Sequence, residues 1–309
     1  MTAGERRGLA VGAAIFLAAA FVPMLSEGYG LSLAVTVVMY AVLTTSWTLF
    51  SGPTHYISLA TAAFFGLGMY TVAALIEVFP YPVLLVMATI VGAVLAALIG
   101  LATLRLSGVY FVIFTLGLAE MVRQLVTWVQ TTMGTSSGLV VLTSIDEPMI
   151  YWQLLALAAA VYLASWRIGR SRLGFALRII GGDEVVAAHS GINTAHAKIA
   201  LFVISGAVAA LTGAILAPRW TYVEPVIAFS PMLSFLVVIM ALLGGVHRLW
   251  GPLLGVIPFT FLWDVVTATF PNQTALMLGL CFLLIVYIVP NGFAGLIENL
   301  IRRRPLLAS

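Results

Sequence analysis

Long apolar runs recur along the whole chain, and short polar segments separate them. Each run holds about 17–22 residues, enough for one helix to cross a hydrocarbon core roughly 30 Å thick. The runs lack the two-residue alternation of barrel strands, so they predict helices. We therefore expect an all-α polytopic membrane protein with about ten transmembrane helices. Their approximate bounds are 8–25, 31–50, 60–77, 82–104, 109–128, 150–167, 197–217, 231–246, 251–270 and 274–290.

The composition agrees with this pattern and excludes a soluble protein. Of the 309 residues, 62% are hydrophobic and 8% are charged, whereas a soluble domain carries about 25% charged residues. This excludes a soluble globular protein, and we treat residues 1–309 as a single transmembrane domain. The one cysteine, Cys281, lies in the last apolar run, so a disulfide framework within the chain is excluded as well.

The distribution of basic residues predicts the orientation in the membrane. If the N-terminus lies in the cytoplasm, 12 of the 14 Lys and Arg residues fall on the cytoplasmic side, and the other two are Arg123 and Arg219. This matches the positive-inside rule, so both termini are expected in the cytoplasm. The N-terminal Glu5-Arg6-Arg7 and the apolar run after it resemble a signal peptide, but the run is long enough to remain as a first helix.

A polar, glycine-rich stretch between the second and third runs predicts a break at membrane depth. Gly52 and Pro53 are expected to stop the second helix, because proline lacks an amide hydrogen and restricts the residue before it. Non-helical backbone is tolerated at this depth only where protein buries it or water lines it. A broken or re-entrant segment near 51–60 therefore predicts either a substrate pathway beside Ser58 and Thr61, or a simple inner loop.

The helix after this break carries small residues that favour close packing. Gly66 and Gly68, with Ala62 and Ala63, permit another helix to approach closely. This fits either interpretation of the break.

Ionisable residues inside the runs are rare and costly in lipid. Glu120 and Arg123 stand three residues apart near the middle of the fifth run, so they share a helix face. They form either a structural pair that joins helices or a gate that contacts a polar solute. Asp264 lies nearer the outer end of the ninth run and is expected to be an interfacial residue.

The longest inner segment, 168–196, is amphipathic rather than lipid-soluble. It predicts two helical pieces, Gly174–Ile180 and Asp183–Ser190, with a break at Gly181-Gly182 and Asp183 as a cap of the second piece. Its apolar residues need a surface to pack on, either this chain or a partner. They are Leu173, Leu177, Ile179, Val185 and Val186.

No pattern of an enzyme stands out. The four histidines are scattered, without the spacing of metal ligands, and the glycine-rich loop that binds nucleotide phosphates is absent. The single lysine, Lys198, follows no such loop. We expect no catalytic residues, no metal site and no cofactor in this chain, and a membrane-embedded enzyme is disfavoured.

Four blocks in order resemble the inner-membrane permease subunits of branched-chain amino acid ABC transporters. They span residues from about 50 to 300. The first runs from Ser58 to Tyr70 (SLATAAFFGLGMY), where the family usually reads SLGHAAFFGIGAY. The others are LSGVYF at 106–111 with Thr115-Leu116 and Glu120, SRLGFALR at 171–178 with Asp183-Glu184 and Gly191, and LGG at 243–245 with LWGP at 249–252.

The resemblance implies a division of labour among several chains. This chain would be a multi-pass permease in the bacterial inner (plasma) membrane, paired with a second, homologous permease. Two ATPase subunits, which bind ATP and Mg²⁺, would dock on the cytoplasmic face, and an extracytoplasmic solute-binding protein would deliver the solute. Segment 168–196 would be the coupling loop. A stand-alone proton-coupled secondary transporter using Glu120 or Asp264 is the main alternative.

The matching blocks and the predicted break supply the candidate site residues. For the substrate pathway they are Ser58, Thr61, Phe64, Phe65, Tyr70, Tyr110, Thr115 and Glu120. For ATPase coupling they are Arg172, Gly174, Leu177, Arg178, Asp183, Glu184 and Gly191.

Two departures from the family pattern concern the substrate and the coupling loop. Ala60-Thr61 stands where the family usually has Gly-His, and Gly181-Gly182 stands where a charged or polar pair is common. The first departure lies in the expected pathway. The resemblance implies import of branched-chain or related small amphipathic amino acids, with urea, short amides and aromatic acids as alternatives.

Overall fold

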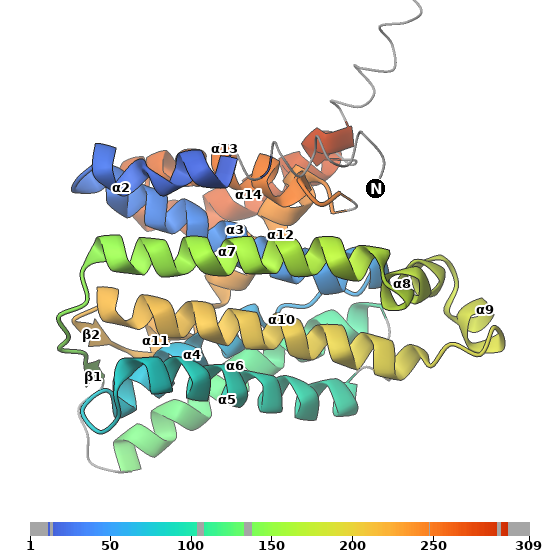
Figure 1. Ribbon diagram of the computed structural model, residues 1–309, viewed down its shortest axis with the longest axis horizontal. Helices are drawn as coiled ribbons and strands as arrows, with labels where there is room; N and C mark the ends of the chain where they lie inside the picture. The colour runs from blue at the N-terminus through green and yellow to red at the C-terminus, as the bar shows by residue number, and fades with distance from the viewer. Residues whose placement is uncertain are drawn as a thin grey trace, which may run out of the picture.

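The computed structural model describes residues 12, 15–103, 108–132, 138–246, 248–288 and 292–295, and most of these residues lie in helices. The long helices run roughly side by side in one bundle (Figure 1). The expected all-α architecture of a membrane protein is confirmed. The predicted positions of both termini fall outside the described residues.

The elements are as follows. The longer helices are α3 (Tyr29–Thr54), α5 (Tyr81–Thr103), α6 (Val109–Thr132), α7 (Glu147–Arg170), α10 (Thr194–Leu216) and α13 (Gly251–Thr269). The shorter helices are α2 (Val22–Leu25), α4 (Thr61–Leu75), α8 (Arg172–Gly182), α9 (Glu184–His189), α11 (Pro225–Ala228), α12 (Pro231–Gly244) and α14 (Thr274–Ile288). The remaining elements are two 3-10 turns, η1 (Ala217–Arg219) and η2 (Pro271–Gln273), and two antiparallel strands, β1 (Leu139–Val140) and β2 (Tyr222–Val223).

Seven helical segments of the described chain are long and apolar enough to cross a membrane. They coincide with seven predicted spans, namely 31–50, 82–104, 109–128, 150–167, 197–217, 231–246 and 251–270. The predicted third and tenth spans fall on shorter apolar helices, Thr61–Leu75 and Pro271–Ile285. The predicted first span, 8–25, lies partly outside the described residues, so the number of ten remains a prediction.

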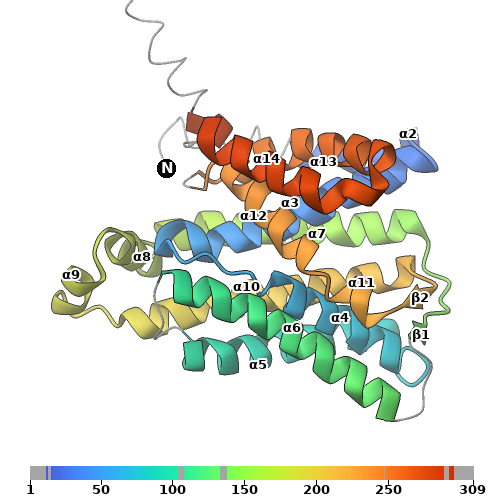
Figure 2. The same cartoon turned by 180° about the vertical axis from the view of Figure 1, so that it is seen from behind.

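Helix α10 lies at the centre of the packing. It contacts α3, α4, α5 and α7, and both views show it between α7 and α5 (Figures 1 and 2). Helices α13 and α14 form a layer on the other side of α3 and α7. The strands β1 and β2 pair at one end of the bundle, and α8 and α9 lie at the opposite end.

Glycines bring α4 and α10 into backbone contact. A methyl group added at Gly68 would lie 1.7 Å from the carbonyl oxygen of Ala210, and one at Gly213 would lie 2.0 Å from that of Phe65. Both distances are far below van der Waals contact, so only glycine fits at either position. The predicted role of Gly68 in close helix packing is confirmed.

The end of α3 corrects one expectation. The helix does not stop at Gly52-Pro53 but continues to Thr54, and His55 then adopts the left-handed conformation, with φ of 59°. Proline disfavours a helical neighbour partly through that neighbour's Cβ, which Gly52 lacks. The non-helical residues are 55–60, inside the predicted interval of 51–60.

Gly213→Ala is expected to lower the free energy of unfolding by about 1–3 kcal/mol, because the added methyl overlaps the backbone of α4. Gly117→Ala is the control, since nothing lies within 4 Å of the added atom, and it should stabilise α6 by about 0.5–1 kcal/mol. Thermal unfolding of both variants in the same detergent measures the difference. Equal unfolding temperatures would show that the α4–α10 contact is looser than described.

Candidate functional site

The break between α3 and α4 is buried, and side chains satisfy its backbone groups. Ser58 and Leu59 are each 5% exposed. The indole nitrogen of Trp47 donates to the carbonyl oxygen of Ser58 at 2.8 Å, and the amide of Leu59 donates to Thr115 Oγ1 at 3.0 Å. Helices α3 and α6 are thereby joined to the break by hydrogen bonds that replace those of a regular helix.

Ser234 of α12 makes the third attachment. Its hydroxyl donates to the carbonyl oxygen of Leu59 at 2.8 Å and accepts from the amide of Ala62 at 2.9 Å. Ser234 is fully buried. Sequence reasoning missed both Ser234 and Trp47. A single serine among the apolar residues of 231–244 was the available signal.

The structure separates the predicted pathway residues into two groups. Six of them are buried, namely Ser58, Thr61, Phe64, Phe65, Tyr70 and Thr115. Among these, Ser58, Thr61 and Thr115 gather around the break, whereas the Tyr70 hydroxyl reaches the carbonyl oxygen of Val223 at the strand end of the bundle. The other two, Tyr110 and Glu120, lie on an outward face of α6, where Tyr110 is 73% exposed.

Glu120 and Arg123 form an ion pair within α6, and the side-chain Nε2 of Gln124 also donates to Glu120 Oε1, at 3.0 Å. The side chains of Arg123 and Glu120 are 23% and 42% exposed. All these partners belong to one helix, so the pair does not join helices within the described chain. Large apolar residues of α6 are exposed around it, including Ile113, Phe114, Met121, Leu125 and Trp128.

The predicted coupling segment forms two helices at the end of the bundle opposite the strands. Ser171 caps α8 by accepting from the amide of Gly174 at 3.3 Å, and Asp183 Oδ1 accepts from the amide of Val186 at 3.2 Å. The predicted capping role of Asp183 is confirmed. The break itself falls at Asp183, because α8 includes Gly181 and Gly182.

One face of α8 packs inside this chain. Leu177 is 1% exposed, and methyl groups added at Gly174 and Gly181 would overlap the carbonyl oxygens of Ile168 and Pro53. The Gly181 contact places α8 directly against the end of α3. The outward residues of the segment include Arg172, Phe175, Arg178, Glu184, Val186 and Gly191.

The only lysine of the chain ties α9 to the break. Lys198 is 1% exposed; it pairs with Glu184 and donates to the Tyr56 hydroxyl at 3.0 Å. That hydroxyl donates to Glu184 Oε2 at 3.2 Å. Burial raises the pKa of the Glu184 carboxyl, but the hydrogen bonds from Lys198 and Tyr56 and the lysine charge outweigh burial and hold it below its usual value. The sequence indicated Glu184 as a coupling residue but did not indicate its two partners, Lys198 and Tyr56.

Asp264 lies beside a small polar cavity at the other end of the bundle. The Tyr29 hydroxyl donates to its carboxylate, and the cavity of about 100 Å³ between α3 and α13 is also lined by Ser32, Thr36 and Thr260. Asp264 is therefore held by a partner on a neighbouring helix.

Membrane-length helices are those of a polytopic membrane protein, and a broken segment held inside the bundle is typical of transporters. Within that class, the family described as branched-chain amino acid transport system / permease component matches residues 29–289. The chain belongs to this family of permease components.

Individual relatives share this length with low identity. The chain is 24% identical over 317 aligned positions to the high-affinity branched-chain amino acid transport system permease protein LivM of Salmonella typhimurium, covering 91% of this chain and 73% of the relative. LivM of Escherichia coli is 25% identical with the same coverage. The ribose import permease protein RbsC of Haemophilus influenzae is 25% identical over 44% of this chain and 43% of its own length. No solved structure matches the chain.

Ser234→Ala is expected to lower the free energy of unfolding by about 1–3 kcal/mol, since it leaves the buried carbonyl of Leu59 and the amide of Ala62 without this partner. Thr89→Ala is the matched control. The Thr89 hydroxyl bonds only its own helix, at Leu85, so its removal should have little effect. Thermal unfolding compares the two, and equal unfolding temperatures would contradict the role given to Ser234.

Proposed function

We propose that this chain is the permease subunit of an ATP-driven importer for branched-chain or related small amphipathic amino acids. The family match and the LivM relatives, which cover 91% of the chain, support this proposal. A second permease completes the membrane unit. Two ATPase subunits bind and hydrolyse ATP with Mg²⁺, and an extracytoplasmic binding protein delivers the solute.

The observation that carries the proposal is the partly exposed Glu120–Arg123 pair on the apolar face of α6. Charges in contact with hydrocarbon are costly, so ionisable residues in spanning helices face a bundle interior or a water-filled cavity. The described chain does not cover this face. A second permease, with the solute route between the two subunits, would give the pair a protein or water environment. Tyr110 lies on the same helix and is also exposed.

The end of the bundle with α8 and α9 is assigned to the cytoplasm. Described basic residues gather there: Arg167, Arg170, Arg172, Arg178, Lys198 and Arg248. Five described acidic residues lie at the strand end, Glu27, Glu77, Asp146, Glu147 and Glu224, together with Arg219, whereas two, Asp183 and Glu184, lie at the α8 end. This asymmetry follows the positive-inside rule and supports cytoplasmic termini in a bacterial inner membrane.

In this mechanism the ATPases push on the exposed side of α8 and α9. Arg172, Phe175 and Val186 offer that surface, and Gly191, with φ of 78°, turns the chain from α9 toward α10. The motion reaches the break through the contact of Gly181 with Pro53 and through Lys198. Reversing a 1:99 population of inward and outward states needs about 5.5 kcal/mol, which ATP binding and hydrolysis can supply.

Substrate choice rests mainly with the binding protein, because the candidate route offers few polar side chains. The partial similarity to RbsC adds a sugar to the substrates worth testing, beside urea, short amides and aromatic acids. Reconstitution of the chain with its ATPases and binding protein, followed by uptake of labelled leucine, tests the proposal. Uptake that needs ATP and the binding protein supports it. Uptake by this chain alone, driven by a proton gradient, contradicts it and directs attention to Glu120 and Asp264.

Phe175→Asp is expected to abolish both ATPase co-purification and uptake while the permease stays folded, because Phe175 is 67% exposed. Leu177→Asp should instead unfold α8, since Leu177 is buried in this chain. Val78→Asp is the control: Val78 is 69% exposed at the strand end, which lies opposite the proposed docking surface.

Co-purification, uptake and thermal unfolding of the three variants separate these effects. Normal ATPase binding by Phe175→Asp would show that the docking surface lies elsewhere.

A further inference from the structure

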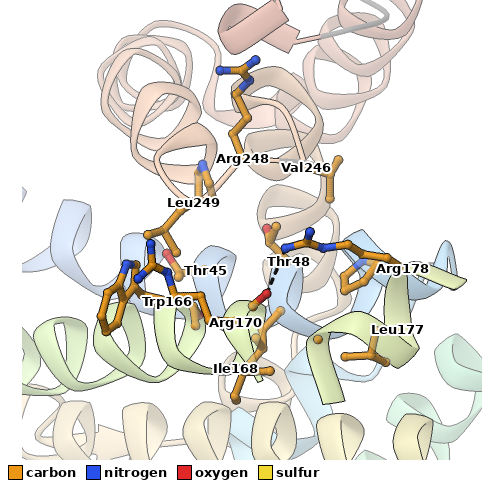
Figure 3. Close-up of a pocket in the computed structure, with 16 residues that line it drawn as sticks. Thr45, Thr48, Trp166, Ile168, Arg170, Leu177, Arg178, Val246, Arg248 and Leu249 are labelled. Atoms are coloured by element: carbon orange, nitrogen blue, oxygen red, sulfur yellow. Dashed lines mark hydrogen bonds between the residues drawn. The ribbon is translucent and has the colours of Figure 1, made fainter. Parts of the chain in front are cut away.

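Two cavities with polar groups lie beside α3, one near each end of the helix. Figure 3 shows the larger, of about 310 Å³, where α3, α7 and α8 meet. Two of its arginines have partners within the chain: Arg178 Nη2 donates to the carbonyl oxygen of Gly169 at 2.9 Å, and the Arg170 guanidinium lies 4.5 Å from the centre of the Trp166 ring. The smaller cavity, of about 100 Å³ between α3 and α13, contains polar oxygens that lack such partners.

Asp264 is the one charged residue in the lining of the smaller cavity. The Tyr29 hydroxyl donates to Asp264 Oδ2, whereas Oδ1 accepts no hydrogen bond within the described ranges. No basic side chain of those ranges forms an ion pair with this carboxylate. A carboxylate in a membrane-spanning helix is costly unless another group compensates its charge, so the cavity favours a positively charged ligand.

A guanidinium lies near the cavity, but its charge is already compensated. Arg219 is not part of the lining; it donates to the carbonyl oxygen and the hydroxyl of Ser32 and, at 3.4 Å, to Thr36 Oγ1. Its Nε lies 3.3 Å from Glu147 Oε1. Because Arg219 pairs with Glu147, the Asp264 carboxylate decides which charge the cavity attracts.

Thr260 gives an independent indication of a ligand. Its side chain is 2% exposed and lines the cavity, and its hydroxyl oxygen has no hydrogen-bond partner in the described part of the chain. Threonine hydroxyls in a helix commonly bond the carbonyl one turn earlier. Thr36 and Thr267, which line the same cavity, do so at 3.0 Å each. A buried hydroxyl without a partner costs free energy, which a bound ligand would recover.

The two unsatisfied groups share one face of α13. Thr260 and Asp264 are four residues apart in this helix, so their side chains are neighbours. Carboxylate and hydroxyl oxygens are ligands of hard cations. One carboxylate neutralises a single positive charge, whereas a divalent ion would leave an uncompensated charge among apolar helices. A cavity of about 100 Å³ also has room for roughly two or three water molecules, which would complete the coordination.

We propose that this cavity binds a small monovalent cation such as Na⁺, with Asp264 and Thr260 as its protein ligands. The hydrogen bond from Tyr29 to Asp264 connects the bound ion to α3. The ion would therefore stabilise the contact between α3 and α13. This inference does not depend on the transported solute or on the ATPases, because every group that carries it belongs to this chain.

Thermal unfolding of the purified full chain in detergent tests the proposal. Sodium chloride is compared with the chloride of N-methyl-D-glucamine at equal ionic strength, because the latter is a monovalent cation too large for a cavity of this size. Sodium is expected to raise the unfolding temperature by about 2 °C at ten times its Kd, and the rise should saturate.

Two variants remove one ligand each with little change of shape. Asp264→Asn should abolish the sodium-dependent rise, and Thr260→Val should weaken sodium binding about tenfold. Glu77→Gln removes an exposed carboxylate outside the cavity, and Thr269→Val removes a hydroxyl of α13 outside it, so both controls should respond like the wild type. If Asp264→Asn does not fold, Thr260→Val and the comparison of salts on the wild type still decide the proposal.

Four results would overturn the proposal. The first is the same unfolding temperature of the wild type in the two salts. The second is an unchanged sodium effect in Asp264→Asn or Thr260→Val, which would place the ion elsewhere. The third is an equal loss of the effect in Glu77→Gln, which would indicate diffuse surface charge. The fourth is stabilisation by methylammonium chloride without stabilisation by sodium chloride, which would assign the cavity to the amine group of a solute.

Discussion

Every buried amide and carbonyl must find a partner within the protein where water is absent, and residues 55–60 are where this chain meets that constraint outside a helix. Side chains of Trp47, Thr115 and Ser234 supply the missing hydrogen bonds. The break is consequently a fixed joint of α3, α6 and α12 rather than a loose connection. A movement of any one of these helices changes the hydrogen bonds of the others.

This joint lies between the two regions that the proposed function requires. Toward the other end, Pro53 lies against Gly181 of α8, and the Tyr56 hydroxyl forms hydrogen bonds with both Lys198 and Glu184 of α9. Toward α6, Thr115 holds the break to the helix that carries Glu120 on its outward face. A displacement at the α8 end therefore has a short, tightly packed route to the face that the proposal assigns to a second permease.

Local patterns predicted the elements well because helix formation in lipid depends on the run of apolar residues itself. Seven predicted spans coincide with membrane-length helices, and the capping role of Asp183 follows from its place before Glu184. The prediction at Gly52-Pro53 was wrong by two residues, since glycine tolerates the helical conformation before proline. The site was predicted less well: Lys198 stood out only as the single lysine, and its partners lie on two other segments, Glu184 14 residues away and Tyr56 142 residues away in sequence.

The sequence by itself determined that the chain forms membrane-spanning helices, that the helical structure is interrupted near residue 55, and that the chain resembles one family of permeases. These properties follow from composition, short-range spacing and local motifs. Only the tertiary structure decided which polar residues are used within the chain and which face outward. It buried Leu177 and exposed Phe175, although both are apolar and two positions apart. That choice depends on which neighbouring helix covers each face of α8, and a residue's own chemistry does not contain this information.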